Sequence, residues 1–177
     1  MKKGPFGLEM GMSMAEFNEP LDEIVPGKFY TKIVPKPHSA FEGYVLAITP
    51  NHGLFWVKGI GKTIQTNPYG IEVLAEFDSM KSKLEKKYGK HDLADFLMLD
   101  SIWNEPRDWM QGILNGERVL MAQWAPKYGS ILSESLVSIA LLASASDTSS
   151  GHIVIEYSFK NFTEAELEIS NLEDESL

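Results

Sequence analysis

Between residues 71 and 88, apolar side chains recur at spacings of three and four positions along the chain. The recurring positions are Ile71, Leu74, Phe77, Met80 or Lys81, Leu84 and Tyr88. This spacing places them on one face of an amphipathic helix, because about 3.6 residues complete each turn. Lysines crowd the last turns and Gly89 follows them, as is typical of a helix C-terminus. The pattern predicts a long helix that ends at Gly89.

Apolar runs elsewhere in the chain predict strands. The runs at 44–49 and 54–57 flank the turn Pro50-Asn51-His52-Gly53, which predicts a β-hairpin. Further strands are predicted over 5–10, 29–34, 118–124, 136–143 and 152–159, and the last three are expected to form an antiparallel meander. The segment 95–99 fits a strand or a helix equally well.

Two short helices are predicted from their first residues. Ser13 followed three positions later by Glu16 forms a capping-box pattern, and Pro20 interrupts the helix that this pattern begins. Pro106 falls in the first turn of a helical segment that extends to Leu114.

Together these elements predict an α+β fold with an antiparallel sheet of about six or seven strands, one long amphipathic helix and one or two short helices. The length of 177 residues suits a single domain, expected over residues 1–162. Residues 163–177 are expected to form an acidic C-terminal tail, since they contain six acids and no base. Such a composition fits either a short helix or a solvated segment.

The charge balance narrows the choice of partner. The chain has 25 Asp and Glu against 16 Lys and Arg, a formal net charge of −9. A phosphate backbone would be repelled by this surface, so we expect no nucleic-acid ligand and favour a basic protein partner. The basic N-terminal pair lacks the apolar run of a secretory signal, and no apolar stretch approaches about 18 residues. We therefore expect a cytoplasmic protein that does not insert into a membrane.

Motifs that commonly mark catalysis are incomplete here. Cysteine is absent, which removes disulfides, thiolate metal sites and thiol nucleophiles. Gly59-Ile60-Gly61-Lys62-Thr63 ends like a phosphate-binding loop, but Trp56 stands where that loop needs its first glycine, so a strand end is the better interpretation. None of the four histidines stands four positions from another, the spacing that aims two at one metal. We expect a non-catalytic protein without cofactor or metal.

One segment combines acidic and aromatic side chains at high density. The candidate partner-binding residues are Asp92, Asp95, Asp100, Trp103, Glu105, Arg107, Asp108 and Trp109. Tryptophan and arginine are frequent in interface hot spots, and acids around them would favour a basic partner. Two alternatives stay open. The two tryptophans could pack a short helix onto the sheet, or the carboxylates, with His91, could meet in a cleft and serve a small metal-dependent or acid–base enzyme.

Two short stretches resemble a known group of proteins. Phe6-Gly7-Leu8-Glu9-Met10-Gly11-Met12-Ser13 resembles the strand and helix start of small bacterial α+β proteins of unassigned function, and Lys87-Tyr88-Gly89-Lys90 is similar to a helix end common among them. Some of these proteins are immunity-like partners of contact-dependent or polymorphic toxins. The resemblance implies an immunity protein that neutralises a basic, nuclease-like toxin by direct binding, and it transfers no catalytic residue. A homodimeric structural or regulatory module is the remaining alternative.

Overall fold

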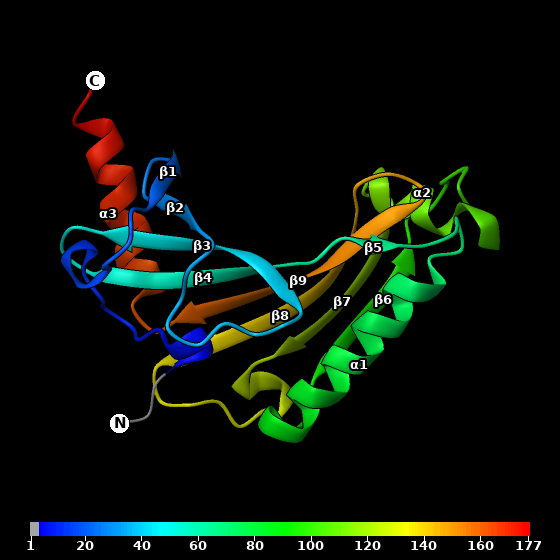
Figure 1. Ribbon diagram of the computed structural model, residues 1–177, viewed down its shortest axis with the longest axis horizontal. Coiled ribbons are helices and arrows are strands. Elements are labelled where there is room, and N and C mark those ends of the chain that lie inside the picture. The colour runs from blue at the N-terminus through cyan, green and yellow to red at the C-terminus, as the bar shows by residue number, and fades with distance from the viewer. Residues whose placement is uncertain (1–3) are drawn as a thin grey trace. The chain divides into compact units, whose positions relative to one another are not determined.

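The protein has an α+β fold, seen in a computed structural model that describes residues 4–177 (Figure 1). The strands are β1 (Asp22–Val25), β2 (Lys28–Thr31), β3 (Phe41–Thr49), β4 (Gly53–Gly61), β5 (Ile64–Gln65), β6 (Asp92–Leu97), β7 (Arg118–Trp124), β8 (Leu136–Ala145) and β9 (Ser150–Phe159). The α-helices are α1 (Ile71–Tyr88), α2 (Trp109–Leu114) and α3 (Phe162–Asp174). Four single turns of 3-10 helix complete the set: η1 (Pro5–Gly7), η2 (Met14–Glu16), η3 (Pro106–Asp108) and η4 (Pro126–Tyr128).

The strands form one mostly antiparallel sheet in the order β1-β2-β3-β4-β9-β8-β7-β6, with β5 paired to β9. Its nine strands exceed the six or seven predicted. The sequence pattern missed β1 and β5 because each is short and neither alternates clearly. The predicted hairpin corresponds to β3 and β4, the ambiguous segment is strand β6, and the predicted meander corresponds to β7, β8 and β9.

Contacts within the chain cluster into two compact units. The first contains the described part of Met1–Ile60, together with Ser133–Ser138 and Glu156–Leu177, and the second contains Gly61–Leu132 and Ile139–Ile155. Strands β8 and β9 each begin in one unit and end in the other. Both units therefore draw on segments that are far apart in the sequence.

The core of the first unit includes the contact between α3 and the β3–β4 hairpin. Ala47, Phe55 and Ala165 are fully buried against one another at this contact. The Asn161 side chain precedes the helix and donates hydrogen bonds to the His52 and Leu54 carbonyl oxygens, at 3.0 and 3.2 Å. Of the two alternatives for residues 163–177, the structure therefore shows a helix. It extends as far as Asp174 and packs on the sheet at Ala165.

The N-terminal segment differs from its prediction. Residues 5–7 form a single 3-10 turn instead of the start of a strand over 5–10, and Phe6 has a positive φ of 55°. The Phe6 ring lies edge-on to three others, those of Phe41, Tyr44 and Tyr157, with centroids 4.7 to 5.8 Å away. These long-range ring contacts fix a backbone conformation that local propensity would not choose. The capping box is confirmed, since the Ser13 N–H donates to Glu16 Oε2 at 2.7 Å.

The second unit is built around α1, whose predicted bounds are confirmed. Its buried stripe is Val73, Phe77, Met80, Leu84 and Tyr88, while Ile71 is 57% exposed. In the first turn of the helix, the buried residue is therefore Val73 and not the predicted Ile71. Gly151 of β9 lies under this stripe: a Cβ on it would come within 3.0 Å of Val73 Cγ2.

The end of α1 is fastened to the loop after β7. The Trp124 indole N–H donates to the Gly89 carbonyl at 3.1 Å, and the Ile131 N–H donates to the Tyr88 carbonyl at 2.8 Å. The Ser130 hydroxyl donates to the Lys90 carbonyl. The first two bonds satisfy carbonyls that a helix C-terminus leaves without partners, and the third holds the residue that follows the helix cap.

Candidate protein-interaction surface

Strand β6 lies at one end of the strand order and pairs with β7 alone. The six pairs run without a register shift from Asp92 opposite Gln123 to Leu97 opposite Arg118. Side chains alternate between the two faces of a strand, so Asp92 and Asp95, three positions apart, lie on opposite faces. Asp95 lies on the face that β7 buries with Leu120, and its carboxylate is 3.7 Å from the Arg118 guanidinium.

The outer edge of β6 offers backbone groups for pairing. The Met98 N–H donates to the Glu117 carbonyl at 2.7 Å, just beyond the last pair of the ladder. Hydrogen-bonded pairs alternate along antiparallel strands, so the N–H and C=O groups of Leu93, Asp95 and Leu97 point away from β7. An edge of this kind can accept a strand from another chain.

The second face of β6 and its neighbours forms an apolar surface that we call the open face. Its residues are Ala94 and Phe96 of β6, Val119 and Met121 of β7, and Ala140 and Leu142 of β8. Each of them stays in contact with solvent, and Phe96 is 49% exposed. The opposite face of the same strands is buried through Leu120, Ala122, Trp124, Ile139 and Leu141. An apolar sheet face in contact with solvent is a common feature of interaction sites.

The loop that follows β6 and leads to η3 adds two apolar side chains that are surrounded by solvent. Leu99 is 95% exposed and Ile102 is 74% exposed. The loop is nevertheless defined by local bonds: the Ser101 N–H donates to the Met98 carbonyl at 3.3 Å, and the Trp103 N–H donates to Ser101 Oγ at 3.2 Å. Its backbone therefore presents two hydrophobic side chains where burial against a partner would be favourable.

The structure divides the eight predicted site residues into exposed and packed groups. Exposed to solvent are Asp92, Asp95, Asp100, Glu105 and Arg107, while Trp103, Asp108 and Trp109 are half-buried. Trp109 packs closely on Gly70, where an added Cβ would lie 2.3 Å from Trp109 Cε3. Asp108 closes the η3 turn by accepting the Glu105 N–H at 3.2 Å. Trp109 and Asp108 thus have structural roles, and the exposed carboxylates belong to β6 and to the loop that follows it.

His91 is directed toward α1 and the core. Its ring centroid is 5.1 Å from that of Trp124, and Nδ1 is 4.0 Å from Glu85 Oε1. The carboxylates of the enzyme alternative are spread over a strand, a loop and a turn, with Asp92 and Asp95 on opposite faces. Among residues 4–177 there is no group of three or more His, Asp or Glu side chains placed to hold a metal ion.

The sequence located the acidic loop but not the open face. Apolar residues of β7 and β8 look like core residues in the sequence, and only the pairing with β6 reveals which of them reach solvent. A usable signal is the run from Leu93 to Ile102, in which seven apolar residues stand with only two acids.

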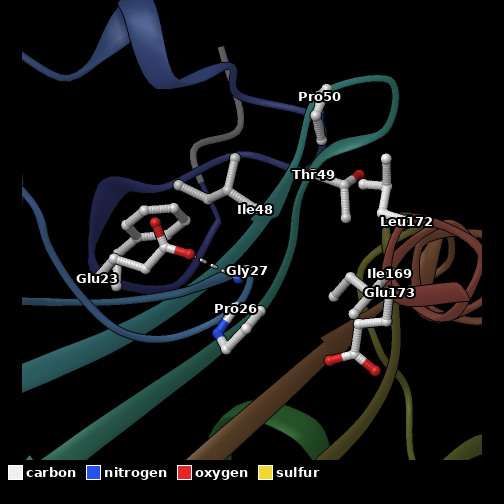
Figure 2. Close-up of a pocket in the computed structure, with 10 residues that line it drawn as sticks. Glu23, Pro26, Gly27, Ile48, Thr49, Pro50, Ile169, Leu172 and Glu173 are labelled. Carbon is white, nitrogen blue, oxygen red and sulfur yellow. Dashed lines mark hydrogen bonds between the residues drawn. The ribbon is translucent and has the colours of Figure 1, made fainter. Parts of the chain in front are cut away.

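The first unit contains a groove between the β1–β2 turn, the end of β3 and α3 (Figure 2). Its volume is about 450 Å³, and it is lined by Glu23, Pro26, Gly27, Phe29, Ile48, Thr49, Pro50, Ile169, Leu172 and Glu173. The lining is largely apolar, with one carboxylate from β1 and one from α3.

Next to this groove, Glu168 joins α3 to the turn between β3 and β4. Its carboxylate lies 2.6 Å from His52 Nδ1 and accepts the Asn51 N–H at 3.0 Å. Burial raises the pKa of Glu168, but hydrogen bonds from Thr49, His52 and Asn51, with attraction to His52, outweigh it and hold the pKa below its usual value.

Comparison with known proteins gives no relative for this chain: no family model, no curated protein and no solved structure matches it. Within the described residues, no helix has both the length and the apolar character that crossing a membrane requires.

Proposed function

We propose that this chain is a non-catalytic protein-binding protein that recognises a basic partner through the open face and the loop after β6. The observation that carries the proposal is the exposure of Leu99 and Ile102 in a loop that is held by its own hydrogen bonds and directly follows β6, a strand of the open face. Hydrophobic side chains that folding leaves in water gain free energy when a partner buries them.

Charge supports a basic partner over an acidic or neutral one. The exposed carboxylates of Asp92, Asp100 and Glu105 border the apolar residues, and Arg107 is the single base of the segment 92–108. An apolar centre with charged residues around it is the usual anatomy of a protein interface. Rim charges of one sign chiefly accelerate association with a partner of opposite sign.

A cationic toxin is the partner to test first, because the N-terminal segment resembles immunity-like proteins. We propose that such a toxin would be neutralised by direct contact with this surface. The protein would be co-expressed with the product of the adjacent gene, and the affinity of any complex measured by calorimetry at low and at high salt.

The decisive comparison is between loop and control variants. Replacing Leu99 and Ile102 by Ser should weaken binding by about tenfold or more, the loss expected for hot-spot side chains. Ile131→Ser is the matched control, because Ile131 is 80% exposed in the same unit but outside the loop. A complex whose affinity changes neither with high salt nor with the loop substitutions would contradict the proposal.

A homodimer is a second candidate, favoured by the same open face. A second copy would cover an apolar sheet face as a partner would. Analytical ultracentrifugation of the free protein distinguishes the two: a dimer that Phe96→Ser dissociates would assign the open face to self-association.

A further inference from the structure

The groove of the first unit is a preformed concave site. Ile48 is 3% exposed within it, and Ile169 and Leu172 of α3 lie along its other side (Figure 2). The β1–β2 turn closes one end, where Gly27 has a φ of 78° and an added Cβ would come within 2.9 Å of Ile169 Cδ1. The volume of about 450 Å³ falls in the range of small-molecule sites.

Two carboxylates border this apolar space from different elements. Glu23 belongs to β1 and Glu173 to α3, and Figure 2 shows them on opposite sides of the groove. The ion pairs formed within residues 4–177 join His52 to Glu168, Lys81 to Asp78, His91 to Glu85 and Arg118 to Asp95, so Glu23 and Glu173 are in none of them. The Nζ of nearby Lys28 lies over the Trp56 ring, 4.9 Å from its centroid.

The negative charge of the whole chain is concentrated in this unit. Its segments contain 14 acidic and seven basic residues, a net charge of −7, whereas the segments of the second unit contain 11 and nine, a net charge of −2. Helix α3, which forms one side of the groove, contains acids and no base. A cation entering the groove is therefore attracted by the unit as a whole as well as by Glu23 and Glu173.

We propose that the groove binds a small amphiphilic cation, a protonated amine attached to a hydrocarbon or aromatic body. The apolar body would be buried against Ile48, Ile169 and Leu172, and the ammonium group would lie between the carboxylates of Glu23 and Glu173. An anionic amphiphile would contact the same apolar lining, but its negative charge would be repelled by both carboxylates. This site is separate from the loop after β6, so it does not depend on the proposed function.

The test uses three probes that share one hydrocarbon body and differ in charge: octylamine, octanol and octanoate at pH 7. Each is titrated below its micellar concentration into the full-length protein, labelled with ¹⁵N, and amide shifts of β1, β3 and α3 are followed by NMR. We expect saturable shifts, with the highest affinity for octylamine, a lower affinity for octanol and the lowest for octanoate. Equal affinity of octylamine and octanol, or no saturable shifts with octylamine, would overturn the proposal.

Matched variants separate a specific contact from general attraction. Glu173→Gln should weaken octylamine binding by about two- to fivefold, the factor expected for an ion pair that solvent still reaches, and leave octanol binding unchanged. Glu175→Gln is the matched control. It removes one negative charge just after the end of α3, at a residue that does not line the groove. If both variants weaken binding equally, the carboxylate contact is wrong.

Leu172→Ser tests the apolar part of the site without touching the core, since Leu172 is 45% exposed. It should weaken octylamine and octanol by the same factor, and circular dichroism would verify that the variant folds. Concentration-dependent self-association that Leu172→Ser abolishes, without octylamine binding, would instead assign the groove to a second copy of the chain and overturn the proposal.

Discussion

Gly70 shows how one residue without a side chain positions part of the candidate surface. It precedes α1 with a φ of 68°, and an added Cβ would lie 2.3 Å from Cε3 and 2.5 Å from Cζ3 of Trp109. Gly70→Ala should therefore lower the free energy of unfolding twice over, by about 1 to 2 kcal/mol for the left-handed backbone and by a further 1 to 3 kcal/mol for the collision. Urea unfolding would measure the total.

Gly116→Ala is the control for this substitution. Gly116 also has a positive φ, of 71°, but no atom lies within 4 Å of an added Cβ. The loss of stability in Gly116→Ala therefore measures the backbone cost alone. Equal losses for the two variants would mean that Trp109 yields to the new methyl group without cost.

Glu168 provides a prediction about pH. Its pKa is lowered in the folded protein, so its contribution is fully present above the pKa of the unfolded chain and is lost as the pH falls through the folded pKa. At pH 7, Glu168→Gln should lower the free energy of unfolding by about 1 to 2 kcal/mol. This lies at the lower end of the range of contributions from hydrogen bonds to charged groups. The difference from the unmodified protein should shrink below about pH 4. Chemical unfolding across this pH range would measure it.

Glu166→Gln is the matched control, since Glu166 lies on the same helix and is exposed. A stability difference for Glu168→Gln that persists unchanged in acid would show that packing, and not the ionised carboxylate, is what the substitution removes.

Single residues also mark where sequence reasoning succeeds and where it does not. Ser13 and Glu16 are three positions apart, so their contact could be predicted from sequence alone. Phe6 could not be placed this way, because its positive φ depends on rings that stand 35 or more positions later in the chain. The bond between His52 and Glu168 joins residues 116 positions apart and has no local signal either.

Among the elements, β6 has an edge that its own acids protect. Asp92 and Asp95 place a negative charge on each face of this strand, and two copies meeting edge to edge would bring like charges together. Replacing both by Asn should increase self-association of the free protein. Sedimentation velocity at several concentrations would measure it.

The control removes the same number of charges elsewhere, through Asp174→Asn with Glu175→Gln at the end of α3. If that pair increases self-association equally, the loss of net charge, and not the edge of β6, is responsible. Circular dichroism would verify that the Asp95→Asn change, which removes the partner of Arg118, leaves the fold intact.

Helix α1 and the open face differ in how far the sequence determines them. The helix is specified by its own spacing of apolar residues, so its bounds could be read directly, although Val73 and not Ile71 begins the buried stripe. The open face depends on which strands become neighbours. Met121 contributes to it only because Ala94 and Leu142 lie on either side, and that pairing is set by the whole sheet.

Over the whole molecule, charge is distributed unevenly between the two units. The first has a net charge of −7 and the second −2, although the acidic segment proposed to meet a basic partner is in the second. In the second unit the acids of 92–108 are offset by five lysines between positions 81 and 90. Long-range attraction of a cationic partner therefore comes chiefly from the first unit, whereas the exposed apolar side chains that could hold it after contact are in the second.

This uneven charge predicts that salt stabilises the two units to different extents. At about 0.01 M salt, charges interact over about 30 Å, and at 0.15 M over about 8 Å, so added salt relieves repulsion most where the net charge is largest. Hydrogen exchange followed by mass spectrometry should show greater protection of α3 and β1 on adding NaCl, and little change in α1 and β7. Replacing the exposed Glu164, Glu166 and Glu175 by Gln should reduce the response of the first unit. An equal response in both units would show that local ion pairs, and not the net charge of each unit, govern the effect of salt on the fold.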